Sequence, residues 1–139
     1  DYDNYILMKK SYESIASPFI GLFDKKLKLI EVNSKKNGLT KKIIEDIQHK
    51  DNYIMYISPE GTRTYTENLK SGYWVISKEL NLDVCYIGID FYDKTIKIES
   101  PRKVEEQWDE EIIKFKESSL KYKPLFPENC YFYQKDKDM

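Results

Sequence analysis

Tyr53-Ile-Met-Tyr-Ile-Ser-Pro-Glu-Gly-Thr-Arg63 is the stretch of the sequence that decides the fold. Its first six residues are rich in β-branched and aromatic side chains, which predicts a short strand buried on both faces. Pro59 removes a backbone donor and Gly61 permits a tight turn with positive φ, so we expect the strand to end there. A loop just beyond the carboxyl end of a sheet strand is where α/β proteins commonly bind ligands.

The turn presents a carboxylate, a hydroxyl and a guanidinium on Glu60, Thr62 and Arg63. Arginine offers a rigid fork of donors that suits phosphate, and the N–H groups of a turn can add to such an anion site. A solvated turn in which Glu60 and Arg63 pair with each other is the alternative interpretation. Both interpretations remain open on these residues alone.

Length and charge limit the class of protein. A chain of 139 residues is typical of one domain, and we expect a single domain over residues 1–134 followed by a frayed, charged tail at residues 135–139. The 23 Lys and Arg residues against 24 Asp and Glu residues give a net charge of −1. This balance supplies no global basic field, so we expect no nucleic-acid partner.

The two cysteines, Cys85 and Cys130, have neither metal-ligand spacing nor the density of a disulfide scaffold. We therefore expect no metal site and a reducing compartment, either the cytoplasm or the cytoplasmic face of a membrane. Cys85 lies in an apolar run and is expected to be a small buried side chain. No apolar run approaches the roughly 18 residues of a membrane span, and no signal peptide is visible.

Strand-like and helix-like segments alternate along the chain. The expected strands are residues 5–8, 27–32, 53–58, 83–90 and 95–98. The expected helices are residues 11–22 with an interruption at Pro18, residues 40–49 with Thr40 as N-cap, residues 73–80, and residues 101–119. This order predicts an α/β fold with a parallel or mixed central sheet flanked by helices.

The centre of that sheet is expected to hold two apolar runs. Residues 53–58 and 84–91 should be adjacent, parallel strands joined through the helix at residues 73–80. Residues 95–98 should form a hairpin with the second run, after a short turn at Asp93-Lys94. Residues 131–133, Tyr-Phe-Tyr, are expected either to form an edge strand or to pack on the core.

A family resemblance follows from these motifs. Ser58-Pro-Glu-Gly-Thr-Arg63 resembles the Pro-Glu-Gly-Thr-Arg signature of the glycerophospholipid acyltransferase family, which includes the 1-acylglycerol-3-phosphate acyltransferases. The likeness continues through four further segments and covers roughly residues 5–98. Leu69-Lys-Ser-Gly72 is similar to a Lys-x-Gly element of the family, and residues 84–92 are similar to the strand that follows that element. Pro18-Phe-Ile-Gly21 and Ile30-Glu-Val-Asn-Ser34 are similar to two upstream elements.

The resemblance implies a reaction and a site. An acyl group would move from acyl-CoA or acyl carrier protein, as co-substrate and with no other cofactor, to a hydroxyl of a lysophospholipid or glycerol-phosphate acceptor. The acceptor phosphate would be bound by the signature turn and the lysine that follows it, which are Glu60, Gly61, Thr62, Arg63 and Lys70 in this sequence. Arg63 would bind phosphate oxygens, and Glu60 would hold the loop or a glycerol hydroxyl.

The sequence also departs from the family pattern. The family's general base belongs to a His-x-x-x-x-Asp motif, which we expect upstream of Asp1, so that this chain alone would be inactive. The one histidine, His49, is followed five residues later by Ile54 and ends a predicted helix, where a cation needs no functional explanation. Ser34 replaces an arginine of the second motif, and Cys85 replaces a proline of the fourth.

Three functions therefore remain open: an acyltransferase, a non-catalytic acyltransferase-fold protein that binds lipid or serves a structural assembly, and an unrelated α/β domain that carries the motif by chance. A mild basic cluster at residues 25–28 and 35–36 leaves a peripheral membrane contact open beside the simpler interpretation of a solvated face.

Overall fold

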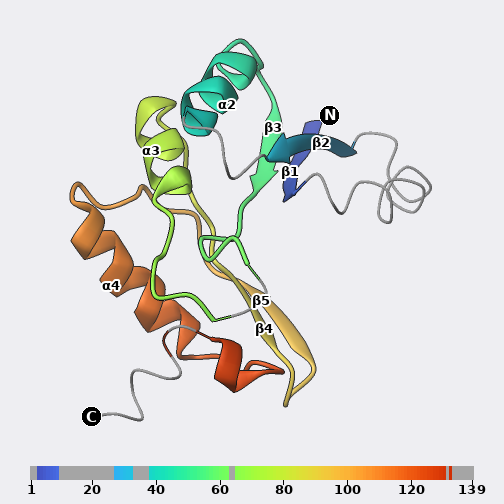
Figure 1. Ribbon diagram of the computed structural model, residues 1–139, viewed down its shortest axis with the longest axis vertical. Helices are drawn as coiled ribbons and strands as arrows, with labels where there is room; N and C mark the ends of the chain where they lie inside the picture. Colours follow the sequence, from blue (N-terminus) through green and yellow to red (C-terminus); the bar gives the residue numbers. More distant parts are fainter. Residues whose placement is uncertain (1–2, 10–26, 33–37, 63–64, 131, 133–139) are drawn as a thin grey trace. The chain divides into compact units, whose positions relative to one another are not determined.

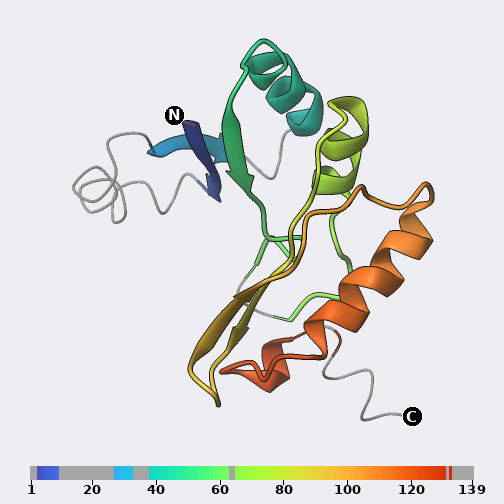
Figure 2. The same cartoon turned by 180° about the vertical axis from the view of Figure 1, so that it is seen from behind.

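The computed structural model describes residues 3–9, 27–32, 38–62, 65–130 and 132 (Figures 1 and 2). The chain is α/β and divides into two compact units, an N-terminal unit, Asp1–Ile57, and a C-terminal unit, Ser58–Met139. Four of the expectations fall outside what the structure describes: the helix at residues 11–22, the basic cluster at residues 25–28 and 35–36, the position of Arg63, and the tail at residues 135–139.

The described strands of the N-terminal unit form a three-stranded sheet. Strand β1 (Asp3–Lys9) lies between β2 (Leu27–Val32) and β3 (Tyr53–Tyr56) and pairs in parallel with both. In this register Tyr5 lies opposite Lys28 on one side and Met55 on the other. All three strands lie close to their expected positions.

Helix α2 (Leu39–Ile47) is the described helix of this unit, and it begins one residue before the expected N-cap, Thr40. The cap is Gly38, whose φ of 90° suits glycine and whose carbonyl accepts the Lys42 N–H at 3.0 Å. Ile43 and Ile47 are buried, so the helix has an apolar face turned away from solvent. His49 follows the helix in an exposed turn.

The C-terminal unit contains two helices. Helix α3 (Gly72–Glu79) matches the expected helix, whereas α4 (Trp108–Ser119) begins seven residues later than the expected start at Pro101. The backbone before α4 has other partners: the Glu105 carbonyl accepts the Trp74 indole N–H at 2.8 Å, and the Glu106 carbonyl accepts the Lys78 ammonium at 2.8 Å. These contacts with α3 hold the segment outside the helix.

Strands β4 (Ile87–Asp90) and β5 (Thr95–Ile98) form the expected antiparallel hairpin, with Ile87 opposite Ile98 and Asp90 opposite Thr95. Its turn has four residues, 91–94, instead of the expected two, and Lys94 has a φ of 52°. The Glu99 N–H binds the Tyr86 carbonyl, and Val84 pairs with Arg102 further along. One strand has one residue between these pairs and the other has two, so a bulge lies at residues 100–101.

The expectation that residues 53–58 and 84–91 are adjacent parallel strands is wrong for the described strands. β3 pairs with β1, at one edge of its sheet, and β4 pairs with β5. Side chains of β3 alternate between half-buried and exposed, so the strand is not buried on both faces. A hairpin across four residues closes a much shorter loop than a crossover through a helix, and this favours the local pairing of β4.

Aromatic side chains connect the helices and the hairpin of the C-terminal unit. The Phe115 ring on α4 lies 5.5 Å from Tyr86, 5.8 Å from Phe132 and 6.5 Å from Tyr73, measured between ring centroids. Phe132 is buried, so this residue packs on the core, one of the two expected alternatives. Cys85 is exposed, contrary to expectation, because it lies opposite the bulge and outside the regular hairpin.

Candidate functional site

The turn that follows β3 in the sequence has the local geometry that the sequence predicts. The Gly61 N–H donates to the Ser58 carbonyl at 3.2 Å, which closes a four-residue turn around Pro59 and Glu60. Gly61 has a φ of 64°, in the left-handed region that glycine adopts without steric cost. The expectation of a tight, positive-φ turn is therefore confirmed.

Lys70 closes the other side of this turn. Its backbone N–H donates to the Pro59 carbonyl at 2.8 Å. Its side chain crosses Gly61 so closely that a methyl group on Gly61 would lie 3.1 Å from Cε of Lys70 and 3.8 Å from Nζ. The structure therefore brings together two of the sequence-predicted site residues, Gly61 and Lys70, which are nine positions apart in the chain.

The remaining predicted site residues belong to the same turn. The Glu60 side chain is half-buried and Thr62 is exposed, and both interact with neighbouring groups. Arg63 lies outside the described residues. Lys70 is exposed, and among the described residues its ammonium forms no ion pair. The turn thus has an exposed lysine side chain, that of Lys70, lying close to the backbone of Gly61.

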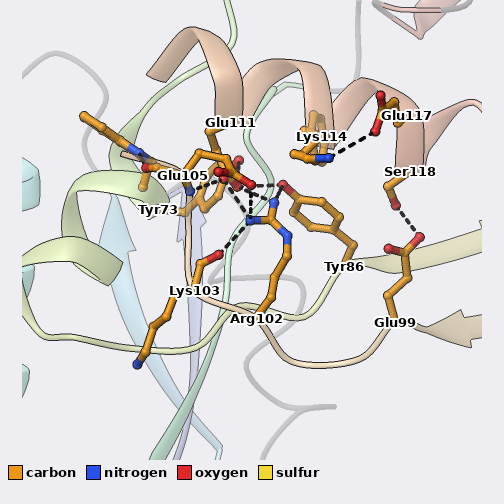
Figure 3. Close-up of polar contacts among 12 residues, drawn as sticks. Tyr73, Tyr86, Glu99, Arg102, Lys103, Glu105, Glu111, Lys114, Glu117 and Ser118 are labelled. Carbon is orange, nitrogen blue, oxygen red and sulfur yellow. Dashed lines mark hydrogen bonds and ion pairs between the residues drawn. The ribbon is translucent and has the colours of Figure 1, made fainter. Parts of the chain in front are cut away.

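A second polar cluster, which the sequence did not predict, surrounds the fully buried carboxylate of Glu111 on α4 (Figure 3). Its Oε1 accepts hydrogen bonds from Tyr73 at 3.0 Å, Tyr86 at 2.6 Å and Arg102 at 3.0 Å. Its Oε2 accepts Arg102 at 3.1 Å and the Glu105 backbone N–H at 2.9 Å. Arg102 thus binds both carboxylate oxygens.

These contacts determine the ionisation of the cluster. Burial alone would raise the pKa of Glu111, but hydrogen bonds from Tyr86, the Glu105 backbone, Arg102 and Tyr73 hold that pKa below its usual range. Burial raises the pKa of Tyr73 and of Tyr86, and the Glu111 carboxylate raises both further. The cluster is therefore a carboxylate–guanidinium pair with two neutral phenols.

The geometry of the Glu111 cluster indicates a structural role. No buried side-chain polar atom among the described residues lacks a hydrogen-bond partner, and the Glu111 oxygens have no exposed surface for a substrate. Tyr73 lies on α3, Tyr86 and Arg102 lie on the segments that flank the hairpin, and Glu111 lies on α4. The cluster therefore joins these elements. One signal in the sequence could have revealed it: Glu111 falls three residues after Trp108 and four before Phe115, on the apolar stripe of the helix.

A cavity of about 170 Å³ lies between the hairpin and the C-terminal end of α4. Its walls include Tyr86, Gly88, Phe115, Ser118 and Tyr122, and they are mostly apolar. The ring of Tyr122 packs directly against Gly88, where a Cβ would overlap it. Ligand sites for drug-sized molecules measure roughly 300–1,000 Å³, so this cavity is smaller than such sites.

The described residues contain no group of three or more His, Cys, Asp or Glu side chains placed to hold a metal ion. None of the helices in this part of the chain has both the length and the apolar character needed to cross a bilayer.

Comparison of the chain with protein families, with curated proteins and with solved structures found no match.

Proposed function

We propose that the chain is an acyltransferase-like domain whose turn at residues 58–63, together with Lys70, binds the phosphate of a lysophospholipid or glycerol-phosphate acceptor. The observation that carries the proposal is the Lys70 side chain lying across Gly61. The turn and the Lys70 segment resemble two separate signature elements of the acyltransferase family, and their contact supports a shared role.

The chemistry of the turn suits a phosphate group. Lys70 supplies a compact positive charge. The guanidinium of Arg63, the last residue of the turn, offers a fork of donors for phosphate oxygens. Gly61 has no side chain, so a ligand can approach the backbone closely. In this proposal Glu60 holds the loop or a glycerol hydroxyl of the acceptor.

The reaction proposed for this site is transfer of an acyl group from acyl-CoA or acyl carrier protein to the acceptor hydroxyl. We assign acceptor binding to this chain, and we assign the role of general base to none of its residues. We propose a reducing compartment, the cytoplasm or the cytoplasmic face of a membrane, because the sequence holds two cysteines without the density of a disulfide scaffold.

Calorimetric titration with glycerol 3-phosphate tests the proposal. Loss of a hydrogen-bonded charge at a phosphate is worth about 1.5–3 kcal/mol, so Lys70→Gln should weaken binding at least tenfold. Arg63→Lys should also weaken it, because a fork becomes a point charge. Lys42→Gln removes an equally exposed lysine from α2 and serves as the matched control. Equal affinity in the wild type and Lys70→Gln would refute the site.

A further inference from the structure

Four large apolar side chains lie in solvent at one end of the C-terminal unit. Phe91 and Tyr92 of the hairpin turn are 48% and 75% exposed, and Leu125 and Phe126 are 54% and 57% exposed. The last two precede the short helix η2 (Pro127–Asn129), whose start lies beside the hairpin turn in both views (Figures 1 and 2). We call residues 91–94 and 123–126 together the hairpin tip.

The hairpin tip is held together by specific contacts. The buried carboxylate of Asp90 accepts the backbone N–H groups of Tyr92 at 3.0 Å, Asp93 at 2.8 Å and Lys123 at 3.1 Å. The Phe91 N–H donates to the Lys123 carbonyl at 3.0 Å, and the Lys123 ammonium lies 4.1 Å from the centre of the Tyr92 ring. The exposed apolar groups therefore belong to an ordered surface.

The tip carries a small net positive charge. Its charged side chains are Lys94 and Lys123 against Asp93, while Lys97 on β5 and Glu128 on η2 lie just outside it, and all five residues are exposed. Within the described residues Lys94 and Lys97 form no ion pair. Aromatic and apolar side chains beside lysines are the two signals that together give stable binding to an anionic lipid surface.

We propose that the hairpin tip binds the surface of an anionic lipid bilayer. Phe91, Tyr92, Leu125 and Phe126 enter the interfacial layer, and the lysines bind lipid phosphates. A second copy of the chain is a poorer occupant, because a two-fold contact through the tip would bring the same lysines together. The proposal does not depend on the acceptor site, since it rests on a different surface.

Cosedimentation of the full chain with phosphatidylcholine vesicles, with and without phosphatidylserine, tests the proposal. The wild type should bind vesicles that contain phosphatidylserine. The double variant Tyr92→Ser/Phe126→Ser should lose at least about tenfold in partitioning, because two large apolar groups no longer enter the lipid. Lys94→Gln/Lys123→Gln should lose about tenfold on the anionic vesicles only.

Ile113→Ser is the matched control, because Ile113 is 56% exposed on α4 and lies outside the tip. It should bind like the wild type, and circular dichroism should show that all the variants fold. Absence of binding to anionic vesicles would overturn the proposal, as would an equal loss in the control. Self-association of the wild type that only the tip variants abolish, measured by light scattering, would assign the surface to a second copy instead.

Discussion

Glu111 joins several elements of the C-terminal unit through its buried carboxylate. Its buried carboxylate receives five hydrogen bonds, including two from Arg102. Breaking a buried, hydrogen-bonded ion pair on one side typically costs 3–5 kcal/mol, so we expect Glu111→Gln to lower the free energy of unfolding by about 3 kcal/mol. Urea unfolding followed by tryptophan fluorescence measures this directly, because both tryptophans, Trp74 and Trp108, lie in this unit.

The exposed neighbour Glu110 provides the control, since Glu110→Gln should change the free energy of unfolding by less than about 0.5 kcal/mol. Equal effects of the two substitutions would contradict the structural role of Glu111.

The same carboxylate gives a pH dependence. The pKa of Glu111 is lowered in the folded chain, so its contribution is fully present above the unfolded pKa of about 4.3 and is lost as the pH falls through the folded value. The difference in unfolding free energy between the wild type and Glu111→Gln should therefore be constant from neutral pH down to about pH 5 and narrow below pH 4. If this difference in unfolding free energy widened at acidic pH, the direction assigned to the pKa shift of Glu111 would be wrong.

Gly88 gives the third prediction at this scale. A Cβ there would overlap the Tyr122 ring, so Gly88→Ala should destabilise the unit by about 2 kcal/mol through overpacking. In a Tyr122→Ala background the same change should cost little, because the obstructing ring is gone. A double-mutant cycle in urea measures the coupling, and strict additivity would contradict the contact.

The role of a residue could be predicted from the sequence where backbone conformation alone determines that role. The positive φ of Gly61 follows from a turn after a strand, and the structure confirms it. The family resemblance placed Lys70 at the same site as the turn, but its direct contact with Gly61 joins residues nine positions apart, and no local pattern reveals such a contact. The burial of Glu111 was missed because an acidic residue near a helix start also suits the macrodipole in an exposed position.

At the scale of the element, Asp90 organises the end of the β4–β5 hairpin. We expect Asp90→Ala to increase the hydrogen-exchange rates of the Tyr92, Asp93 and Lys123 amides, which its carboxylate now accepts. Asp93→Ala is the control, since within the part of the chain that the structure describes the Asp93 side chain forms no hydrogen bond that supports the turn. Unchanged exchange in Asp90→Ala would show that the turn is held by other contacts.

Helices and the hairpin followed from apolar periodicity, but their ends did not. The sequence placed a helix start at Pro101, whereas residues 102–107 remain outside the helix because Val84, Trp74, Lys78 and Glu111 bind their backbone. Three of these partners lie 18 to 31 residues away in the sequence, so no local pattern reveals them. The four-residue turn likewise depends on the Asp90 side chain.

At the scale of the molecule, the α/β class and the antiparallel β4–β5 hairpin followed from the sequence, and the strand that pairs with β3 did not. Apolar runs at residues 53–58 and 84–91 suit a two-sided core, yet the structure pairs one with β1 and the other with β5. An apolar run indicates how much of a strand's surface must be buried. It does not specify which neighbouring strand forms the backbone hydrogen bonds with it.

We expect the chain by itself to release no CoA from acyl-CoA in the presence of lysophosphatidate. Deprotonation of a hydroxyl near neutral pH calls for a base with a matching pKa, and the sequence offers one histidine, His49, in an exposed turn after α2. A thiol-release assay measures this. Turnover that disappears in His49→Ala would show that His49 is a base and that our assignment is incomplete.

The central claim is that the turn at residues 58–63 and Lys70 form a phosphate site, and residue-resolved NMR tests it most directly. Addition of glycerol 3-phosphate to the ¹⁵N-labelled chain should shift the amide signals of Gly61, Thr62 and Lys70 in a saturable way, and Lys70→Gln should weaken that response about tenfold. Saturable shifts confined to other parts of the chain, or an unchanged titration in Lys70→Gln, would contradict the claim.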